Sequence, residues 1–259
     1  MNKFNFKKKY GQNFLIDKNV LSKIIENIKA DKDDLIIEIG MGSGNLTKEL
    51  VKFGCPVLGY EIDLDTKKYL DEIKSSNLEI IYEDFLNRNI KKDIEKFQYQ
   101  KIYIVGNLPY YITTPIIEKI TKENLNPKEI LIMVQKEVAE RFSAIPKTKN
   151  YGYITVYLNY YYQVTKLFNV SRNSFIPAPK VESSVIKFIA HNKYKISDET
   201  KFIKLISDAF KQKRKTLLNN LYNYDKEIIE AILVKHNYSN LVRAEELPIE
   251  IFLEITNAL

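Results

Sequence analysis

The segment Asn107-Leu108-Pro109-Tyr110 combines residue types that can hold an amino-purine. The Asn107 amide and the Leu108 carbonyl each present an oxygen that accepts a hydrogen bond. The Tyr110 ring presents a flat face on which a base can stack. A planar ring with an exocyclic NH2 group would satisfy all three at once. The alternative is a structural strand end, in which Asn107 forms a turn and Tyr110 packs into the core.

The surrounding sequence places this segment at one edge of a sheet. Residues 102–106 are apolar and mostly β-branched, which predicts a buried strand. Pro109 lacks an N–H and disfavours helix at Leu108, so the chain must leave the sheet there. Thr114 and Pro115 then predict the N-cap and the first residue of a helix. The segment therefore follows the carboxyl end of a strand, where open α/β sheets bind ligands.

A glycine-rich loop follows an earlier apolar strand at residues 35–39. Gly40, Gly42 and Gly44 are spaced as in nucleotide-binding turns, where glycine lets the backbone approach a ligand closely. The loop departs from the dinucleotide fingerprint G-x-G-x-x-G because Asn45 stands at the position of its third glycine. The Lys-Ser/Thr pair that cradles a pyrophosphate is also missing, so NAD and P-loop nucleotides are both disfavoured.

Acidic residues end the next two predicted strands. Glu61 follows residues 56–60 and could accept hydrogen bonds from two ribose hydroxyls. Asp84 follows residues 78–82 and could accept one from an adenine amine. Either residue could instead be a simple strand-end cap. With the glycine loop, the two describe an adenosine that needs no phosphate neutralisation, which predicts S-adenosylmethionine as the cofactor.

Composition narrows the class of protein. The chain has 259 residues, 45% of them hydrophobic, enough for one large domain or for one with a small appendage. The sequence contains no long apolar run and no secretory signal pattern, so we expect a cytoplasmic protein without a membrane segment. A single cysteine, Cys55, excludes an intramolecular disulfide and a cysteine-based zinc site. Two histidines are too few for a histidine-based metal site.

The net charge of +7 is concentrated in two segments. Residues 1–10 carry four lysines and no acid, and residues 141–182 carry six basic residues, one acid and nine aromatic rings. Basic side chains neutralise phosphates and rings stack on unstacked bases, so these segments predict RNA binding. The candidate residues are Lys7, Lys8, Lys9, Arg141, Lys147, Lys149 and Lys180. The alternative is a solvated lysine surface over a tyrosine-rich core.

Predicted strands and helices alternate over most of the chain. The predicted strands are residues 35–39, 56–60, 78–82, 102–106, 130–134, 164–170 and 184–189. Asp17 is expected to cap a helix, Gly54 to end another in a left-handed conformation, and residues 65–74 to form a third. The alternation predicts an α/β fold with a mostly parallel, doubly wound, seven-stranded sheet.

The pattern becomes purely helical from about residue 192. The predicted helices are residues 198–211, 213–222, 225–236 and 248–257. We therefore expect a Rossmann-like domain over residues 1–191 and a small all-helical domain over residues 192–259.

Six motifs taken together resemble the ribosomal RNA adenine N6-dimethyltransferase family, and in particular its small-subunit (16S) branch. They are Tyr10-Gly-Gln-Asn-Phe-Leu15, Glu38-Ile-Gly-Met-Gly-Ser-Gly44, Glu61-Ile-Asp63, Glu83-Asp-Phe85, Asn107-Leu-Pro-Tyr110 and Phe175-Ile-Pro-Ala-Pro-Lys-Val-Glu-Ser183. They occur in the order of the family and cover most of residues 10–185, and residues 209–217 extend the likeness. Met41, where the family commonly has proline, and a looser tail motif at residues 211–214 are departures.

The resemblance implies a class I methyltransferase fold and roles for individual residues. The implied cofactor contacts are Asn13, Leu15, Gly40, Gly42, Glu61, Asp84, Phe85 and Asn107. Asn107, Leu108, Pro109 and Tyr110 would form the catalytic segment, with Tyr110 stacked on the target adenine. Phe175 would close the other face of that base, and Lys213 and Arg214 would bind RNA.

The reaction implied by the resemblance transfers methyl groups from S-adenosylmethionine to N6 of two adjacent adenosines near the 3′ end of 16S rRNA. The partner would be the small ribosomal subunit, and a role in its biogenesis would accompany methylation. We expect a monomer that uses no metal.

Three alternatives stay open on the sequence. An Erm-type 23S rRNA adenine N6-methyltransferase, which confers macrolide resistance, shares the fold and chemistry, although Gly11, Leu108 and the tail motif favour the small-subunit enzyme. A non-catalytic RNA-binding or transcription factor on the same fold would be expected to lack the glycine loop or the Asn107 segment, and this chain has both. An NAD-dependent enzyme is the third alternative.

Overall fold

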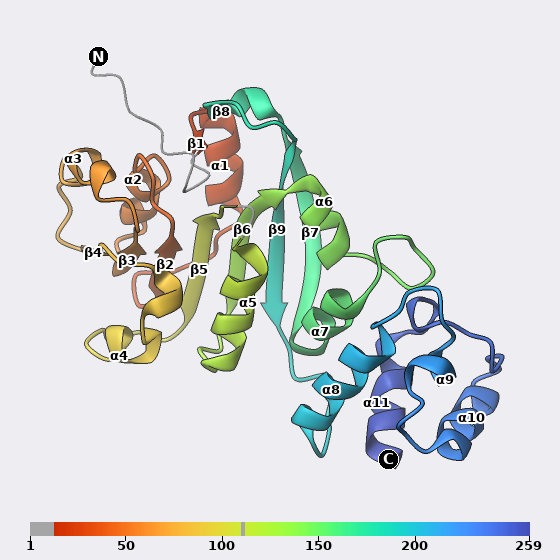
Figure 1. The fold of residues 1–259 in the computed structure, drawn as a ribbon. Helices are drawn as coiled ribbons and strands as arrows, with labels where there is room; N and C mark the ends of the chain where they lie inside the picture. Colours follow the sequence, from red (N-terminus) through yellow and green to blue (C-terminus); the bar gives the residue numbers. More distant parts are fainter. Residues whose placement is uncertain (1–12, 110–111) are drawn as a thin grey trace. The chain divides into compact units, whose positions relative to one another are not determined.

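The computed structural model describes residues 13–109 and 112–259. These residues fall into two compact units, which can be followed along the chain by colour in Figure 1. The first unit runs to Ala139 and resumes over Thr165–Ala190, and the second comprises Glu140–Val164 and His191–Leu259.

The two units differ in one segment from the division that the sequence predicts at residue 191. The sequence pattern assigns Glu140–Val164 to the sheet-containing domain, whereas the structure packs this segment with the C-terminal helices. Within it, the buried Tyr151 hydroxyl donates a hydrogen bond to the Leu247 carbonyl at 2.9 Å. The two residues are 96 positions apart, so no local pattern could reveal the contact.

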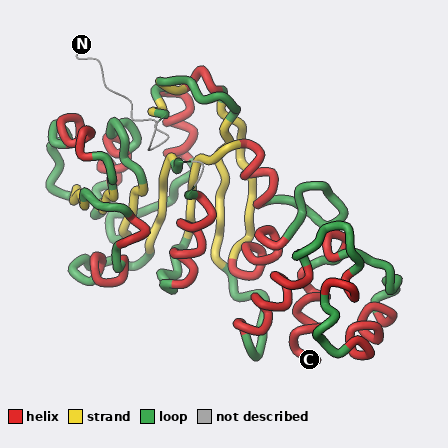
Figure 2. Tube along the Cα trace, viewed as in Figure 1, coloured by secondary structure: helices red, strands yellow, loops and turns green. Residues whose placement is uncertain are grey.

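The first unit is built on a seven-stranded sheet in the order β4-β3-β2-β5-β6-β9-β7. Its strands are β2 (Leu35–Ile39), β3 (Val57–Tyr60), β4 (Leu78–Ile81), β5 (Ile102–Asn107), β6 (Glu129–Gln135), β7 (Tyr162–Val170) and β9 (Ser183–Ala190). Strands β2 to β6 pair in parallel, and β9 is antiparallel to β6. Figure 2 separates these strands, in yellow, from the helices, in red. The predicted α/β class and all seven predicted strands are confirmed.

Short helices and 3-10 turns connect the strands of the first unit. The helices are α1 (Lys18–Glu26), α2 (Thr47–Leu50), α3 (Lys67–Leu70), α4 (Ile90–Ile94), α5 (Thr113–Lys122) and α6 (Lys136–Phe142), which continues into the second unit. The 3-10 turns are η2 (Val51–Phe53), η3 (Leu64–Thr66), η4 (Phe85–Asn87) and η5 (Arg172–Ser174). The Asp17 carboxylate caps α1 by accepting from the N–H groups of Asn19 and Val20, as predicted.

The predicted start of the helix after the Asn107 segment is wrong. Helix α5 begins at Thr113, and its N-cap is Ile112, whose side chain makes no capping bond. Thr114 is therefore not the cap, and Pro115 is the third residue of the helix. Proline is tolerated there because the first N–H groups of a helix have no partner within the helix.

Two short strands form a second, two-stranded sheet that the sequence did not predict. β1 (Phe14–Leu15) pairs in antiparallel fashion with β8 (Phe175–Ile176), with Leu15 opposite Phe175. Each strand has two residues, and about 160 residues of chain separate them. So short a strand has no readable periodicity, which is why the sequence pattern does not reveal it.

The second unit is helical, apart from the first residues of β7. Its helices are α7 (Tyr153–Tyr161), α8 (Glu199–Ala209), α9 (Leu217–Asn220), α10 (Lys226–Lys235) and α11 (Ile249–Ala258), with a 3-10 turn η6 (Ala244–Glu246). The helix predicted over residues 213–222 is limited to α9. Thr216 has an extended backbone, and its hydroxyl accepts a hydrogen bond from the Asn219 N–H. It is therefore the N-cap of α9, and the helix does not include residues 213–215.

Over residues 13–109 and 112–259, none of the helices is both long enough and apolar enough to cross a membrane.

Gly54 provides a test of the turn that joins η2 to β3. Its φ is +78°, in the left-handed region that the sequence predicts, and a Cβ placed there would meet nothing within 4 Å. We expect Gly54→Ala to lower the free energy of unfolding by about 1 kcal/mol through backbone strain alone. Gly54→Asn should cost less, because asparagine tolerates this conformation better. Urea denaturation of both variants would measure this, and an alanine variant as stable as the parent would contradict it.

Candidate active site

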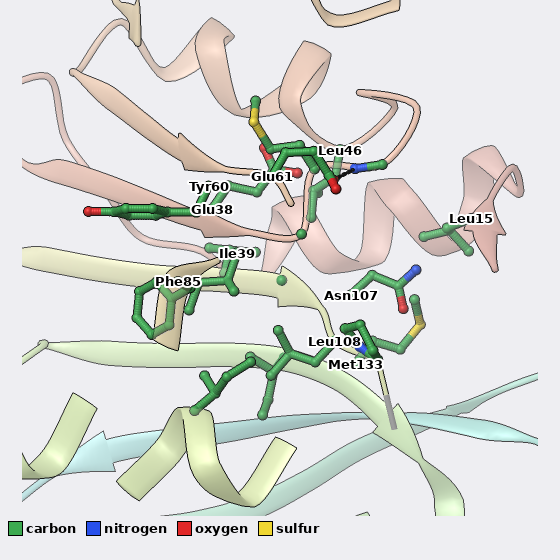
Figure 3. Close-up of a pocket in the computed structure, with 18 of the residues that line it drawn as sticks. Leu15, Glu38, Ile39, Leu46, Tyr60, Glu61, Phe85, Asn107, Leu108 and Met133 are labelled. Carbon is green, nitrogen blue, oxygen red and sulfur yellow. Dashed lines mark hydrogen bonds between the residues drawn. The ribbon is translucent and has the colours of Figure 1, made fainter. Parts of the chain in front are cut away.

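One pocket in the first unit opens at the carboxyl ends of β2, β3 and β5. It brings together every residue predicted to contact the cofactor, namely Asn13, Leu15, Gly40, Gly42, Glu61, Asp84, Phe85 and Asn107. Leu108 and Pro109 of the predicted catalytic segment also line it. Figure 3 shows this pocket with Asn107, Leu108 and Met133 on one side and Glu38 and Glu61 on another. Tyr110 lies outside the described residues.

Side chains would be disfavoured at the glycines of the loop beside this pocket. Gly40, Gly42 and Gly44 all have positive φ, between 55° and 75°. A Cβ on Gly42 would lie 2.9 Å from two ring carbons of Phe14, and one on Gly44 would lie 2.7 Å from Ile73 Cδ1. Larger residues at these positions would be both strained and crowded. At Gly40 and Gly42, which line the pocket, the backbone borders it without a side chain, as the sequence predicts.

The Glu61 carboxylate is buried and oriented by backbone donors. Its Oε2 accepts from the Gly42 N–H at 2.7 Å, and its Oε1 accepts from the Asp63 N–H at 2.8 Å. Burial raises the pKa of Glu61, and the two backbone hydrogen bonds oppose that shift. Each carboxylate oxygen has a second lone pair, so the group can still accept from a ligand. Glu61 thus combines a structural role in the glycine loop with a place in the pocket wall.

Asp84 and Phe85 form the adjoining wall. Asp84 Oδ1 accepts from the Leu86 N–H at 2.9 Å and caps η4, while its side chain also borders the pocket. Asp84 can therefore cap η4 and contact a ligand at the same time. The Phe85 ring is buried and meets the Tyr60 ring edge-on, with centroids 5.1 Å apart. These rings provide an apolar surface against which a planar ligand could pack.

Asn107, the last residue of β5, uses only one end of its amide within the structure. Its Nδ2 donates to the Asn13 carbonyl at 2.9 Å. Its oxygen accepts no hydrogen bond from the described residues, and Figure 3 draws it on the side of Leu108 and Met133. The Leu108 N–H donates to the Met133 carbonyl at 3.1 Å, which extends the β5–β6 pairing past the end of β5. The segment is thereby fixed by the sheet.

The structure does not bring Phe175 to this pocket. Its ring is 2% exposed and lies in the hydrophobic core with Leu15 and Ile24, and it is not among the pocket-lining residues. A role against the target base therefore stays a prediction. Pairing between β1 and β8 nevertheless places Phe175 opposite Leu15, which does line the pocket.

Most of the predicted RNA-binding residues are exposed on the second unit. Those described there are Arg141, Lys147, Lys149, Lys213 and Arg214. The Lys213 ammonium donates to the Lys149 carbonyl at 3.3 Å, so two segments remote in sequence meet here. Lys180 is exposed on the first unit. Lys7, Lys8, Lys9 and Gly11 lie outside the described residues.

Among the pocket-lining residues without a predicted role, three make contacts that shape the site. Asn45 Nδ2 donates to the Leu15 carbonyl at 2.8 Å, and Phe14 packs its ring against Gly42. Glu38 is 1% exposed and accepts from the Thr47 hydroxyl at 2.7 Å. Burial raises its pKa to about 8. A lone acid within the apolar strand β2 was the one signal that could have indicated Glu38 in advance.

Glu38 should make stability depend on pH. Its carboxyl stays protonated in the folded protein to about pH 8 but ionises near pH 4.5 when unfolded. The stability that it contributes is therefore complete below pH 4.5 and is lost as the pH rises to 8, by up to about 1.4 kcal/mol per unit. Glu38→Gln keeps an acceptor for Thr47 and cannot titrate. Denaturation between pH 5 and 8 should show that the free energy of unfolding of the variant rises relative to that of the parent as the pH rises. Parallel pH profiles of the two proteins would refute this.

Comparison with known proteins identifies relatives over nearly the whole chain. A family model described as ribosomal RNA adenine dimethylase matches residues 3–259. The protein named ribosomal RNA small subunit methyltransferase A from Aster yellows witches'-broom phytoplasma (strain AYWB) is 41% identical over 255 residues, covering 96% of this chain and 94% of that protein. The protein of that name from Lactococcus lactis is 39% identical over 266 residues, covering 99% and 90%.

Solved structures agree in fold. A dimethyladenosine transferase from Plasmodium falciparum matches with a TM-score of 0.77 and 28% identity, over 93% of this chain and 95% of that one. The 23S rRNA methyltransferase ErmE matches with a TM-score of 0.73 over 95% and 99%, and at 22% identity it indicates the fold alone. Because the family model spans residues 3–259 and relatives reach 41% identity, this chain belongs to the ribosomal RNA adenine dimethylase family.

Proposed function

We propose that this chain transfers methyl groups from S-adenosylmethionine to N6 of adenosines in small-subunit rRNA, giving N6,N6-dimethyladenosine. The observation that carries the proposal is the pocket itself, in which the glycine loop and the Asn107 segment face the same space. Membership of the family and relatives named as small-subunit methyltransferases support the choice of reaction and RNA.

The pocket fits the adenosine part of S-adenosylmethionine. The backbone of Gly40 and Gly42 borders the pocket without side chains, Glu61 offers carboxylate oxygens for ribose hydroxyls, and Asp84 beside Phe85 offers an acceptor and an apolar face for adenine. No described Lys-Ser/Thr pair cradles a phosphate at the loop, which suits a ligand without one. When bound, S-adenosylmethionine supplies a methyl group already activated by its sulfonium.

The Asn107 segment can make the N6 amine of adenine more nucleophilic. Adenine N6 is a poor nucleophile because its lone pair is delocalised into the ring. The Asn107 oxygen and the Leu108 carbonyl can accept the two N6 hydrogens and hold the amine so that its lone pair turns out of conjugation. These acceptors also stabilise the positive charge that develops on N6 as the new bond forms. The cationic N6 formed by the transfer is strongly acidic and releases one proton to water, so the chemistry depends on positioning and needs no strong base.

The target adenosine must leave its stack in the RNA to reach such a pocket. Exposed basic residues on the second unit, Arg141, Lys147, Lys149, Lys213 and Arg214, together with Lys180, support the phosphate contacts that would hold the RNA. Several finer points stay predictions. They are that Tyr110 and Phe175 contact the two faces of the base, that the targets are two adjacent adenosines near the 3′ end, and that the protein is a cytoplasmic monomer that uses no metal.

The Erm-type alternative acts on the other ribosomal subunit, so the choice of RNA separates the two. We expect labelled methyl transfer to unmethylated small subunits to exceed transfer to large subunits and to naked RNA, with dimethyladenosine as the product in nucleoside mass spectrometry. Preferred transfer to large subunits or 23S rRNA would favour the Erm-type reading. Binding of NAD but not of S-adenosylmethionine in titration calorimetry would reject both.

Asn107→Ala tests the chemistry proposed for the amine. Losing one acceptor at the reacting nitrogen should lower the single-turnover rate about 100- to 1000-fold, which is the usual cost of removing one preorganised hydrogen-bonding partner. The thermal midpoint should change little, because Asn107 lies at the end of β5 and is partly exposed. A near-normal rate in this variant would contradict the role of the amide.

A further inference from the structure

The segment at residues 13–17, here called the strap, lines the pocket with Asn13, Phe14 and Leu15 and accepts hydrogen bonds from two other parts of the pocket wall. Asn107 Nδ2 donates to the Asn13 carbonyl at 2.9 Å, and Asn45 Nδ2 donates to the Leu15 carbonyl at 2.8 Å. Asn107 ends β5, and Asn45 follows the last glycine of the glycine loop. The strap therefore bridges the two parts of the pocket on which the proposed reaction depends.

Further contacts hold the strap along its length. The Ile16 N–H donates to the Ser174 carbonyl at 2.9 Å, and the Ser174 hydroxyl donates to Asp17 Oδ2 at 2.9 Å. The Phe14 ring fills the space that a side chain on Gly42 would occupy. The strap is thus a fixed element of the pocket wall in this structure.

The bond to the strap determines which end of the Asn107 amide faces the pocket. A primary amide has one donor end and one acceptor end, and rotation by half a turn exchanges them at little cost. When the NH2 group donates to the Asn13 carbonyl, the oxygen is directed to the other side. Without the strap carbonyl, the NH2 group could face the pocket, where it would oppose the N6 hydrogens of adenine instead of accepting them.

We propose that Asn45 is a positioning residue for methyl transfer: by holding the Leu15 carbonyl it keeps the strap in place, and the strap carbonyl of Asn13 orients the Asn107 amide. This inference rests on the proposed function. It gives a use to an asparagine that the glycine-loop pattern left unexplained. It also gives the strap a second task besides the predicted cofactor contacts of Asn13 and Leu15.

Asn45→Asp is the sharpest variant, because it keeps the size of the side chain but replaces the donor with a carboxylate that repels the Leu15 carbonyl. With unmethylated small subunits and saturating S-adenosylmethionine, we expect the single-turnover rate to fall about 10- to 100-fold, the scale of a small misplacement of a reacting group. An unchanged rate would overturn the proposal.

Asn77→Ala is the matched control. Asn77 Nδ2 donates to the Val51 and Cys55 carbonyls at 3.1 and 2.6 Å, also in the first unit but outside the pocket lining. Its loss should lower stability and leave the single-turnover rate at its parental value below the unfolding transition. An equal loss of rate in Asn45→Asp and Asn77→Ala would mean that the Asn45 effect comes from general destabilisation, and it would overturn the proposal.

A double-mutant cycle tests whether Asn45 acts through Asn107. In the Asn107→Ala background the amide is absent, so adding Asn45→Asp should lower the rate by less than threefold. A full 10- to 100-fold further loss would show an independent role and overturn the proposal.

Hydrogen exchange at the Ile16 amide reports on the strap without any reaction. Its protection should fall in Asn45→Asp and in Asn107→Ala but not in Asn77→Ala, because only the first two lose a bond to the strap. Unchanged protection in Asn45→Asp would refute the proposal. If no RNA is methylated by the parent, the proposed function fails, and this measurement still decides whether Asn45 holds the strap.

Discussion

Parallel pairing between β2 and β5 is the constraint on which the rest of the site depends. Ile39 stands opposite Gly106, so the next residues along the two strands, Gly40 after β2 and Asn107 at the end of β5, emerge side by side. A Cβ on Gly106 would lie 2.6 Å from the Ile39 carbonyl oxygen, whereas one on Gly40 would be in ordinary contact, 3.6 Å from the Asn107 backbone carbonyl oxygen. Gly106 therefore allows the backbones to approach closely here, and Gly40 allows the chain to turn with a φ of +75°.

The register of this pairing is protected by burial on both faces of the sheet. Every residue of β2 is buried, and so is every residue of β5 except Asn107. A slip of one residue would exchange the two faces of a strand and would carry Asn107 away from the strap. Backbone ladders also continue past the strand ends, since Gly40 N–H donates to Tyr60 and Leu108 N–H to Met133. The loops of the site thus share the rigidity of the sheet.

Polar groups in this pocket serve the fold and remain available to a ligand. Glu61 holds the glycine loop through the Gly42 N–H, Asp84 caps η4, and Asn107 holds the strap through Asn13. Each uses only part of its hydrogen-bonding capacity in doing so. Such double use explains why a strand-end cap and a ligand contact were both reasonable readings of Glu61 and Asp84. It also orients these side chains before any ligand arrives, which lowers the cost of binding.

Local patterns in the sequence were sufficient for the seven strands of the main sheet, for the cap at Asp17 and the left-handed turn at Gly54, and for the glycine loop, Glu61, Asp84 and the Asn107 segment in the pocket. Asn13, Leu15 and Phe85 were expected there only from the family resemblance. Apolar runs, glycine spacing and strand-end acids are read from neighbours in the chain, and parallel α/β topology brings strand ends together. Only the tertiary structure decided the β1–β8 pairing, the bonds from Asn45 and Asn107 to the strap, the burial of Phe175 in the core, and the packing of Glu140–Val164 with the C-terminal helices. These features join segments dozens to more than a hundred residues apart through single side chains or two-residue strands. Such contacts leave no periodicity in the sequence, because their partners are chosen by the folded geometry.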